Sequence, residues 1–504
     1  MGVDWDVIIV GAGLSGVGAA CHLRMRSPDR TFIILEGRAA MGGTWDLFRY
    51  PGVRSDSDMF TLGYSFRPWR SSQSIATGPS IRQYIADTAR HHGVDGLIRY
   101  HHRVIEAAWS TADATWTVSV QRTDNGQRLE MTCRFLYMCA GYYRYDHGYE
   151  PPFPGRHRFS GPVVHPQKWP ESLDYAGRRV VVIGSGATAV TLVPAMAERA
   201  GHVTMLQRSP SYILSVPSHD PLAEALARRL PQRLAYSLVW WRNVIIATLL
   251  YQASRRWPHQ VRRALRAGVV RQLPPGYDVD RHFGPRYHPW DQRMCLVPDS
   301  DLFRAIRRGQ ASVVTGDIES FTETGVKLTS GVEVPADIIV TATGLQLATM
   351  GGARLSVDGV PVSVPDSVVY RGMMLCGVPN LAFTMGYINA SWTLKADLVA
   401  DYVCRLLNHM AGHGHDYCIP QSPDPGEPTR PFIGLTSGYV RRSLADLPKQ
   451  GARRPWLLQQ NYLKDMLLFR HTPVDQAMEF GCARQPAAVG GGEKVPTTAA
   501  GPGG

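Results

Sequence analysis

The sequence predicts an α/β protein, and three observations lead to that prediction. Twice, a short apolar strand runs into a glycine-rich loop and then a helix, first at residues 6–23 and again from residue 179. A further apolar strand follows each unit, at residues 31–35 and 202–206. An arginine-rich segment, residues 215–290, fits neither unit. Since strand–loop–helix–strand units build parallel sheets, we expect two Rossmann-like dinucleotide-binding domains with a helical insertion.

The first loop has the spacing of a dinucleotide-binding loop. Gly11, Gly13 and Gly16 follow the first strand, and Glu36 ends the next strand twenty residues after Gly16. The first glycine permits a tight turn, the second lets backbone approach a pyrophosphate, and the third lets the helix pack on the strand. The carboxylate accepts hydrogen bonds from ribose hydroxyls. A plain glycine turn in a doubly wound sheet is the alternative.

The second loop differs from the first in charge. Gly184 and Gly186 follow a strand as before, with Ala189 in the third glycine position, but Arg208 stands where the first unit has its carboxylate. A guanidinium pairs with a 2′-phosphate, so this site is expected to bind NADP(H). Two unlike dinucleotide sites on one chain imply a flavin that receives hydride from a nicotinamide. We therefore expect FAD and NADPH as cofactors.

Composition and cysteine usage exclude several classes of protein. The 504 residues are 44% hydrophobic and 19% charged, which is typical of a globular protein of several domains. The eight cysteines form no C-x-x-C pair, which argues against a zinc ribbon or a disulfide reductase, and we expect no metal site. Scattered cysteines and an apolar run at residues 7–10 too short for a signal peptide predict a cytoplasmic protein.

The insertion concentrates the positive charge of the chain. Lys and Arg exceed Asp and Glu by 12, and residues 228–271 contain ten arginines with no Lys, Asp or Glu. Within them, residues 234–253 are largely apolar but are interrupted by Arg242 and Asn243. Three alternatives stay open: a buried helix, a transmembrane segment, or a basic amphipathic helix on the cytoplasmic face of an anionic membrane. Nucleic acid is not expected as a partner, because no recognised nucleic-acid-binding fold accompanies the charge. In the third alternative, three tryptophans lie at the membrane interface: Trp240, Trp241 and Trp257.

A longer motif lies between the two glycine loops. Residues 159–170, FSGPVVHPQKWP, match the F-x-G-x-x-x-H-x-x-x-W-P fingerprint through Phe159, Gly161, His165 and Trp169. On this motif the chain resembles the Baeyer–Villiger flavin monooxygenases. The segments WDLFRYP from residue 45, RSDSD from residue 54 and NASWTLK from residue 389 resemble the EthA-type, ethionamide-activating branch.

The resemblance also implies a division of the chain. The FAD-binding domain would comprise residues 1–145 and 341–484, and the NADP-binding domain residues 146–214, with the fingerprint linker, and 291–340. The helical basic insertion would span residues 215–290, and residues 485–504, rich in Gly, Ala and Pro, are expected to be a disordered tail.

In this family an arginine stabilises the anionic flavin C4a-peroxide, and a carboxylate positions the arginine. The resemblance assigns these roles to Arg293 and Asp56, and it gives His165 a part in domain motion rather than in bond chemistry. Without the resemblance, Arg293 would be a surface charge, Asp56 a helix N-cap and His165 a structural residue.

The remaining site residues carry over by position. For FAD they are Gly11, Gly13, Ser15, Gly16, Glu36, Thr44, Trp45, Asp56 and, through its backbone, Val104. For NADP they are Arg54, Gly184, Ser185, Gly186, Thr188, Gln207, Arg208 and Ser209. Asn389 and Trp392 are candidates for the pocket wall, with plain core packing as the alternative.

The implied activity is insertion of one oxygen atom of O2 beside a ketone carbonyl, giving esters or lactones, together with S-oxygenation of thioamides and thioethers. Two alternatives remain. One is an S/N-oxygenating flavin monooxygenase without ketone activity, and the other is a flavin redox sensor docked on a membrane.

Overall fold

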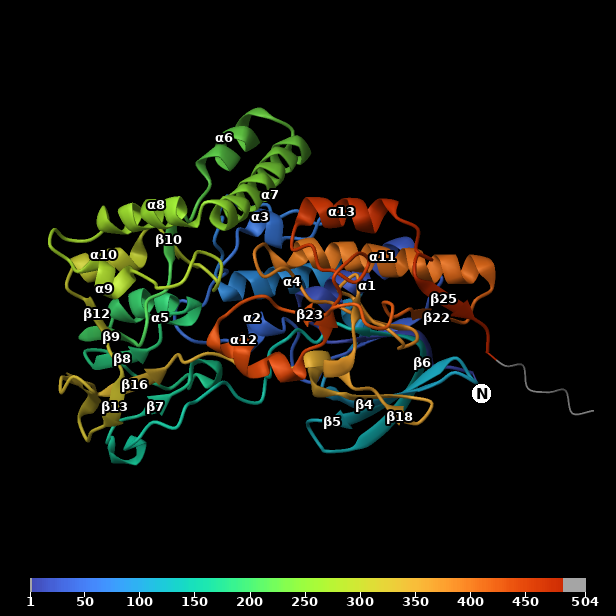
Figure 1. Ribbon diagram of the computed structural model, residues 1–504, viewed down its shortest axis with the longest axis horizontal. Helices are drawn as coiled ribbons and strands as arrows, with labels where there is room; N and C mark the ends of the chain where they lie inside the picture. Colours follow the sequence, from blue (N-terminus) through green and yellow to red (C-terminus); the bar gives the residue numbers. More distant parts are fainter. Residues whose placement is uncertain (1, 484–504) are drawn as a thin grey trace, which may run out of the picture.

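The computed structural model describes residues 2–483 and contains two sheets built around parallel strands (Figure 1). Helices cover both sheets, which confirms the predicted α/β class. The tail expected at residues 485–504 lies outside the described residues.

The first sheet has nine strands and begins with the first glycine-loop unit. Its parallel part joins β3, β2, β1 and β6, with β21 also parallel to β6, and β5 and β4 extend it as an antiparallel meander. These strands are β1 (Trp5–Val10), β2 (Phe32–Leu35), β3 (Ile98–Arg99), β4 (His102–Ser110), β5 (Thr115–Arg122), β6 (Arg128–Met138), β17 (Arg354–Val357), β18 (Val360–Pro361) and β21 (Leu381–Phe383). Strands from the last third of the chain therefore complete a sheet that the N-terminal strands begin.

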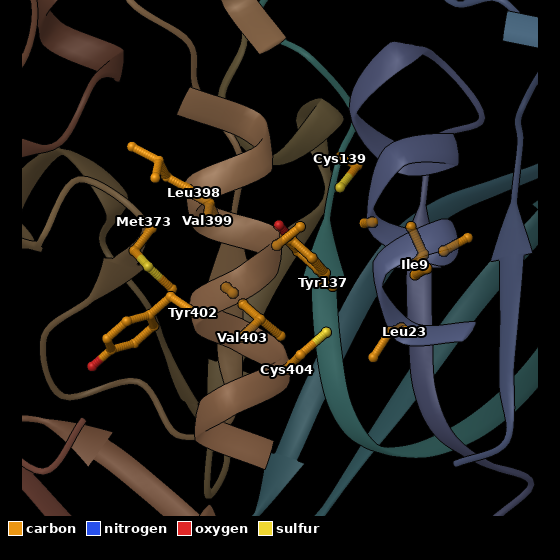
Figure 2. Close-up of a cluster of buried hydrophobic side chains, with 14 of the residues drawn as sticks. Ile9, Leu23, Tyr137, Cys139, Met373, Leu398, Val399, Tyr402, Val403 and Cys404 are labelled. Carbon is orange, nitrogen blue, oxygen red and sulfur yellow. The ribbon is translucent and has the colours of Figure 1, made fainter. Parts of the chain in front are cut away.

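The core of this half lies between the sheet and two helices, α1 (Leu14–Arg26) and α11 (Trp392–His413). Figure 2 shows Val399 and Val403 of α11 on the side of Tyr137 that faces away from Leu23 of α1. Because β1 and β2 are buried, they are almost wholly apolar, as the sequence predicts for parallel strands. The other helices of this half are α2 (Thr44–Leu47), α3 (Met59–Leu62), α4 (Gly78–His91), α12 (Gly438–Ser443) and α13 (Tyr462–His471).

The second sheet contains the second glycine-loop unit. Its five strands are all parallel, in the order β12, β9, β8, β16 and β7. They are β7 (Val163–Val164), β8 (Arg179–Ile183), β9 (His202–Gln207), β12 (Ala311–Thr315) and β16 (Ile338–Thr341), with helices α5 (Ala187–Ala197) and α10 (Asp301–Arg307) packed beside them. A small antiparallel sheet of β13 (Ile318–Phe321), β14 (Gly325–Leu328) and β15 (Glu333–Pro335) adjoins it.

Short strand pairs complete the fold. They are β10 (Ile213–Val216) with β11 (Cys295–Pro298), β19 (Val369–Tyr370) with β20 (Met374–Leu375), β22 (Tyr417–Pro420) with β25 (Met478–Gly481), and β23 (Arg430–Pro431) with β24 (Lys449–Gln450).

Four helices form the arginine-rich insertion, between β10 and β11: α6 (Pro221–Arg229), α7 (Gln232–Arg256), α8 (Pro258–Val270) and α9 (Val279–Phe283). Helices α6 and α7 project from the body of the molecule (Figure 1). Within residues 2–483, α7 alone is long and apolar enough to cross a membrane. Only four of its 25 residues are buried, so the buried-helix alternative is wrong for α7.

The chain passes between the two sheets twice, once after β6 and once after β16. The two connections lie side by side, because Arg144 N donates to Gln346 O at 2.8 Å and Tyr149 N donates to Gly344 O at 3.0 Å. The part of the chain that forms the second sheet is thus inserted between two segments of the part that forms the first sheet, and two adjacent connections join the parts.

Candidate active site

A cavity of about 610 Å³ opens at the carboxyl end of β1, where the first glycine loop leads into α1. Its volume is in the usual range for a ligand site. The residues predicted to hold FAD gather here: Gly11, Gly13, Ser15, Glu36, Thr44, Trp45, Asp56 and Val104 line this first cavity. Gly16 lies just behind the wall.

The glycine loop can have no side chains at two of its positions. Gly11 has φ +102°, and a Cβ there would lie 2.7 Å from the carbonyl oxygen of Cys139. A Cβ on Gly16 would lie 1.8 Å from the carbonyl oxygen of Gly11. No side chain caps the start of α1 at Gly13, so its first N–H groups are free to bind a phosphate.

Glu36 is held where a ribose would lie. Its side chain is buried, with Oε2 accepting from Ala12 N at 2.8 Å and Oε1 from Arg38 N at 3.0 Å. Burial raises the pKa of Glu36, although these two backbone hydrogen bonds and the charge of Arg38 oppose the shift. The free carboxylate lone pairs can accept from ribose hydroxyls.

An aromatic wall closes the first cavity, and sequence reasoning missed most of it. Tyr142 stacks on Trp392 with ring centroids 5.1 Å apart, and the hydroxyls of Tyr142 and Tyr143 are 2.7 Å apart. Trp392 Nε1 donates to Ser15 Oγ at 2.7 Å, so its indole borders this cavity rather than only packing in the core. The available signal was the run of tyrosines directly after Gly141, since ligands bind at the carboxyl ends of parallel strands.

Arg293 and Asp56 meet as predicted. The distance from Arg293 Nη2 to Asp56 Oδ2 is 3.0 Å, and Asp58, rather than Asp56, caps α3. Burial alone would lower the pKa of the Arg293 guanidinium, but the charge of Asp56 and the nearby tyrosine hydroxyls raise it overall. Arg293 therefore presents a permanent positive charge to the cavity.

A second cavity, of about 540 Å³, meets the first at this ion pair. Asp56, Ser57, Arg293, Leu296 and Ala390 line both cavities. Much of the remaining wall of the second cavity comes from α6, α7 and the segments near Trp290 and Tyr462, and the wall includes Asn389. Nothing in the sequence placed α7 beside Arg293, because the contact depends on how the insertion folds back.

The predicted NADP residues form two groups. Arg54 and Thr188 line the first cavity, and Arg54 also pairs with Asp301. Gly184 and Gly186 do not line this cavity and lie at the carboxyl end of β8 and the start of α5.

Around the second glycine loop, Ser185 Oγ donates to Ser209 O at 2.9 Å, and Arg208 is exposed. No ion pair joins Arg208 to any residue between 2 and 483, which leaves its guanidinium available for a phosphate. Gln207 is different, because its buried amide already donates to His282 O and Thr315 Oγ1. Its carbonyl oxygen also accepts from Gly316 N, so this arrangement does not present Gln207 to a ligand.

The fingerprint lies at the junction of the two sheets. Phe159 packs against Phe321, and a Cβ on Gly161 would lie 2.2 Å from Asp337 O. His165 is buried, accepts from Gln167 N at 3.2 Å and lies 3.3 Å from Gly344 O through Nε2. Its ring also fills the space that a side chain on Gly148 would need.

Trp169, the last fingerprint residue, packs against the core of the second sheet. The fingerprint thus joins both connections to the second sheet, and none of its four residues lines either cavity.

The first cavity suits a flavin dinucleotide. Besides the free helix terminus and Glu36, two of its buried arginine nitrogens, Arg38 Nε and Arg54 Nη2, have no hydrogen-bond partner within residues 2–483. Buried guanidinium donors without partners are costly, and phosphate or ribose oxygens would satisfy them. The residues present therefore fit the group.

Comparisons with known proteins agree with this site. The family model "Flavin-binding monooxygenase-like" matches residues 76–261, and "NAD(P)-binding Rossmann-like domain" matches residues 9–73. The chain is 56% identical to the FAD-containing monooxygenase EthA of Mycobacterium tuberculosis over 96% of this chain and 99% of that one. It is 52% identical to the putative FAD-containing monooxygenase MymA of the same organism, over 97% of this chain and 100% of that one.

Solved structures share the fold. Steroid monooxygenase bound to NADP superposes with a TM-score of 0.73 at 23% identity, covering 95% of this chain and 99% of that one. Cyclohexanone monooxygenase in an open form gives a TM-score of 0.73 at 19% identity, covering 94% of this chain and 99% of that one. The cavity, the glycine loops and 56% identity to EthA over nearly the whole chain all agree. The chain belongs to the family of EthA-type FAD-containing flavin monooxygenases, with FAD and NADP as its cofactors.

Proposed function

We propose that this flavin monooxygenase is of the Baeyer–Villiger type and depends on NADPH and O2. It converts a ketone into an ester or lactone and also S-oxygenates thioamides and thioethers. In the ketone reaction, ketone, O2, NADPH and H⁺ give ester, NADP⁺ and water, so one oxygen atom enters the product and the other leaves as water. Reduced FAD, when bound, supplies the activation of O2.

The observation that carries the proposal is the Arg293–Asp56 ion pair at the wall common to both cavities. Oxygen insertion beside a carbonyl develops negative charge on oxygen, and a fixed cation stabilises that charge best where water is excluded. Asp56 keeps the guanidinium in one orientation. A ketone in the second cavity would have its carbonyl against Arg293.

In the proposed reaction, the aromatic wall of the first cavity would limit the access of water to the reacting atoms. The stacked pair of Tyr142 and Trp392 presents an apolar surface beside Arg293, and the Trp392 N–H is already satisfied by Ser15. Such a wall suits a site whose reactive oxygen would otherwise be lost to water as hydrogen peroxide.

The test is an isotope experiment on the FAD-loaded enzyme. A methyl ketone, NADPH and ¹⁸O2 should give an ester that contains one ¹⁸O atom, with NADPH consumed in equal amount. Sulfoxide from a thioether without ester from any ketone would support the S/N-oxygenating alternative. Absence of both products from a broad panel of substrates would overturn the oxygenase proposal.

We also propose a location for the protein. Its cysteine pattern suits the cytoplasm, and the ten arginines of residues 228–271 favour peripheral contact with the anionic cytoplasmic face of a membrane. Vesicle sedimentation combined with turnover separates this from the redox-sensor alternative, which predicts binding without turnover.

A further inference from the structure

We infer that helices α6 and α7 dock on an anionic membrane and that the second cavity receives its organic substrate from the bilayer through a mouth between them. The inference rests on the proposed function for the identity of the reaction. It adds the source of the substrate and its chemical class.

Helix α7 has an exposed apolar face of defined geometry. The side chains at positions 234, 238, 241, 245 and 249 follow steps of four, three, four and four residues, which places them on one side of the helix. They are 36–61% exposed, and they are Leu234, Leu238, Trp241, Ile245 and Leu249. A contiguous exposed stripe of this size marks an interaction surface rather than ordinary surface composition.

The charge around this stripe identifies the occupant as an anionic bilayer. Of the ten arginines in residues 228–271, six have no carboxylate within ion-pair distance among residues 2–483: Arg229, Arg233, Arg256, Arg262, Arg263 and Arg271. Arg229, Arg233 and Arg256 lie at the ends of α6 and α7, and the other three belong to α8 and its C-terminal end. An apolar stripe with unpaired arginines at its ends and exposed tryptophan is the composition of a helix lying in a lipid headgroup layer. Helices α6 and α7 project from the body of the molecule (Figure 1), and every side chain of the stripe is exposed, which suits contact with a flat surface.

The second cavity reaches the surface between α6 and α7, beside the stripe. Leu222 of α6 and Ile246 of α7 both line the cavity, yet they are 45% and 55% exposed, so they mark its mouth. On α7, Ile246 points about 100° away from Ile245, so the mouth lies beside the stripe, toward α6. At its inner end the cavity reaches Arg293 and Asp56. In a docked molecule this mouth would therefore face the lipid, and the inner end of the cavity would lie at the reaction site.

The cavity wall defines the class of substrate. Between the mouth and Arg293 it is mostly apolar, with Val244, Leu250, Met294 and Leu394 along it. A volume of about 540 Å³ holds a long alkyl chain. The structure thus favours a lipophilic ketone or thioether that partitions into membranes, with its chain along α7 and its polar group at Arg293.

The experiment uses the full-length, FAD-loaded enzyme and vesicles of phosphatidylcholine with or without phosphatidylglycerol. The enzyme should sediment with the anionic vesicles and not with phosphatidylcholine alone. The variant L238E/L249E should remain in the supernatant. The matched control V332E/V360E, which adds the same charges at other exposed valines, should sediment as the unaltered enzyme does.

Turnover is measured with tridecan-2-one dissolved in the anionic vesicles and with butan-2-one in solution. L238E/L249E should lose about 10-fold or more with the vesicle-dissolved ketone, because binding is lost, and keep its rate with the soluble one. Ile246→Trp, which narrows the mouth but keeps the face apolar, should still sediment with vesicles and should lose turnover of tridecan-2-one selectively.

Other outcomes overturn one part each. Failure of the unaltered enzyme to sediment with anionic vesicles, or a dimer that L238E/L249E dissociates, would overturn membrane docking in favour of free protein or of a second copy on the stripe. Equal turnover of tridecan-2-one by docked and undocked enzyme would overturn delivery from the bilayer. Vesicle binding with no ester from either ketone would overturn the proposed function and with it the delivery, while docking itself would stand.

Discussion

At the scale of single residues, the site depends on charges that are held in place by neighbours. Arg293 keeps its charge beside Asp56, Glu36 is held by two backbone N–H groups, and Arg208 is exposed without a carboxylate partner among residues 2–483. Each of these arrangements leads to a separate prediction, about ester formation, the affinity for FAD or the KM for NADPH.

Arg293→Ala should lower ester formation by about 100-fold or more, because it removes the positive charge at the reacting oxygen. FAD should remain bound, since the variant leaves Glu36 and the glycine loop unchanged. Ester yield by gas chromatography and the flavin absorbance of the purified variant check this. Ester formation within a factor of two of the unaltered enzyme would contradict the role given to Arg293.

Arg208→Ala should raise the KM for NADPH about 10- to 100-fold, as expected for loss of a charged hydrogen bond of about 1.5–3 kcal/mol. The KM for NADH should stay nearly constant, because NADH has no 2′-phosphate. Steady-state kinetics with both nucleotides test this. Arg199→Ala, another exposed arginine of the same half, serves as the control and should change neither value.

The affinity for FAD should depend on pH through Glu36. Burial raises the pKa of this carboxyl in the protein without flavin, and ribose hydroxyls donate to its ionised form. Binding therefore favours the ionised form, and the affinity should rise as pH increases from about 4.5 through the raised pKa. Flavin fluorescence titration across this range should show the rise, while Glu36→Gln should give a flat profile.

The sequence predicted the chemistry of individual residues better than their partners. Glu36 and the Arg293–Asp56 pair lie where they were expected, the first from spacing and the second from family resemblance. The side chain of Gln207 instead bonds inside the protein, and Arg54 pairs with Asp301. Those partners come from segments about 75 or more residues away, and no local pattern encodes such contacts.

At the scale of elements, the first βα unit depends on close backbone contact. Gly16 stands in the first turn of α1, where an added Cβ would lie 1.8 Å from the carbonyl oxygen of Gly11. The strand, loop and helix were predictable, because short apolar runs and glycine spacing are local features.

Gly16→Ala should destabilise the protein by about 1–3 kcal/mol and weaken FAD binding, because its methyl group would overlap the Gly11 carbonyl. Gly412→Ala in α11 is the matched control, since nothing lies within 4 Å of the added Cβ there. That control should stabilise the protein by about 0.5–1 kcal/mol. Chemical unfolding of both variants checks the two signs, and equal effects would contradict the packing argument.

Helix α7 shows what periodicity cannot decide. Its apolar residues leave a buried, a spanning and a surface helix open in the sequence, although Arg242 and Asn243 disfavour the spanning one, and the choice depends on what packs against the helix. The buried face is small, with Ala235, Val239 and Val244, whereas larger side chains point outward. A surface position is therefore a property of the assembled fold rather than of the helix.

At the scale of the whole molecule, two halves meet at the fingerprint. His165 contacts both connections, through Gly344 and through the space above Gly148. His165→Ala should loosen this junction and lower the fraction of NADPH oxidation that yields ester, with the remainder released as hydrogen peroxide. Measured peroxide per NADPH should rise several-fold, whereas unchanged coupling would contradict a role in domain arrangement.

The junction has a consequence for how the molecule is assembled. Because Arg144 and Gln346 are hydrogen-bonded neighbours, the point where the chain enters the second half lies next to the point where it leaves that half. A protein shortened by joining residue 144 to residue 346 would need only a tight turn to close the gap. Such a truncated chain should still bind FAD but should no longer be reduced by NADPH. The second half would then be a domain that could be replaced by one that binds a different reductant.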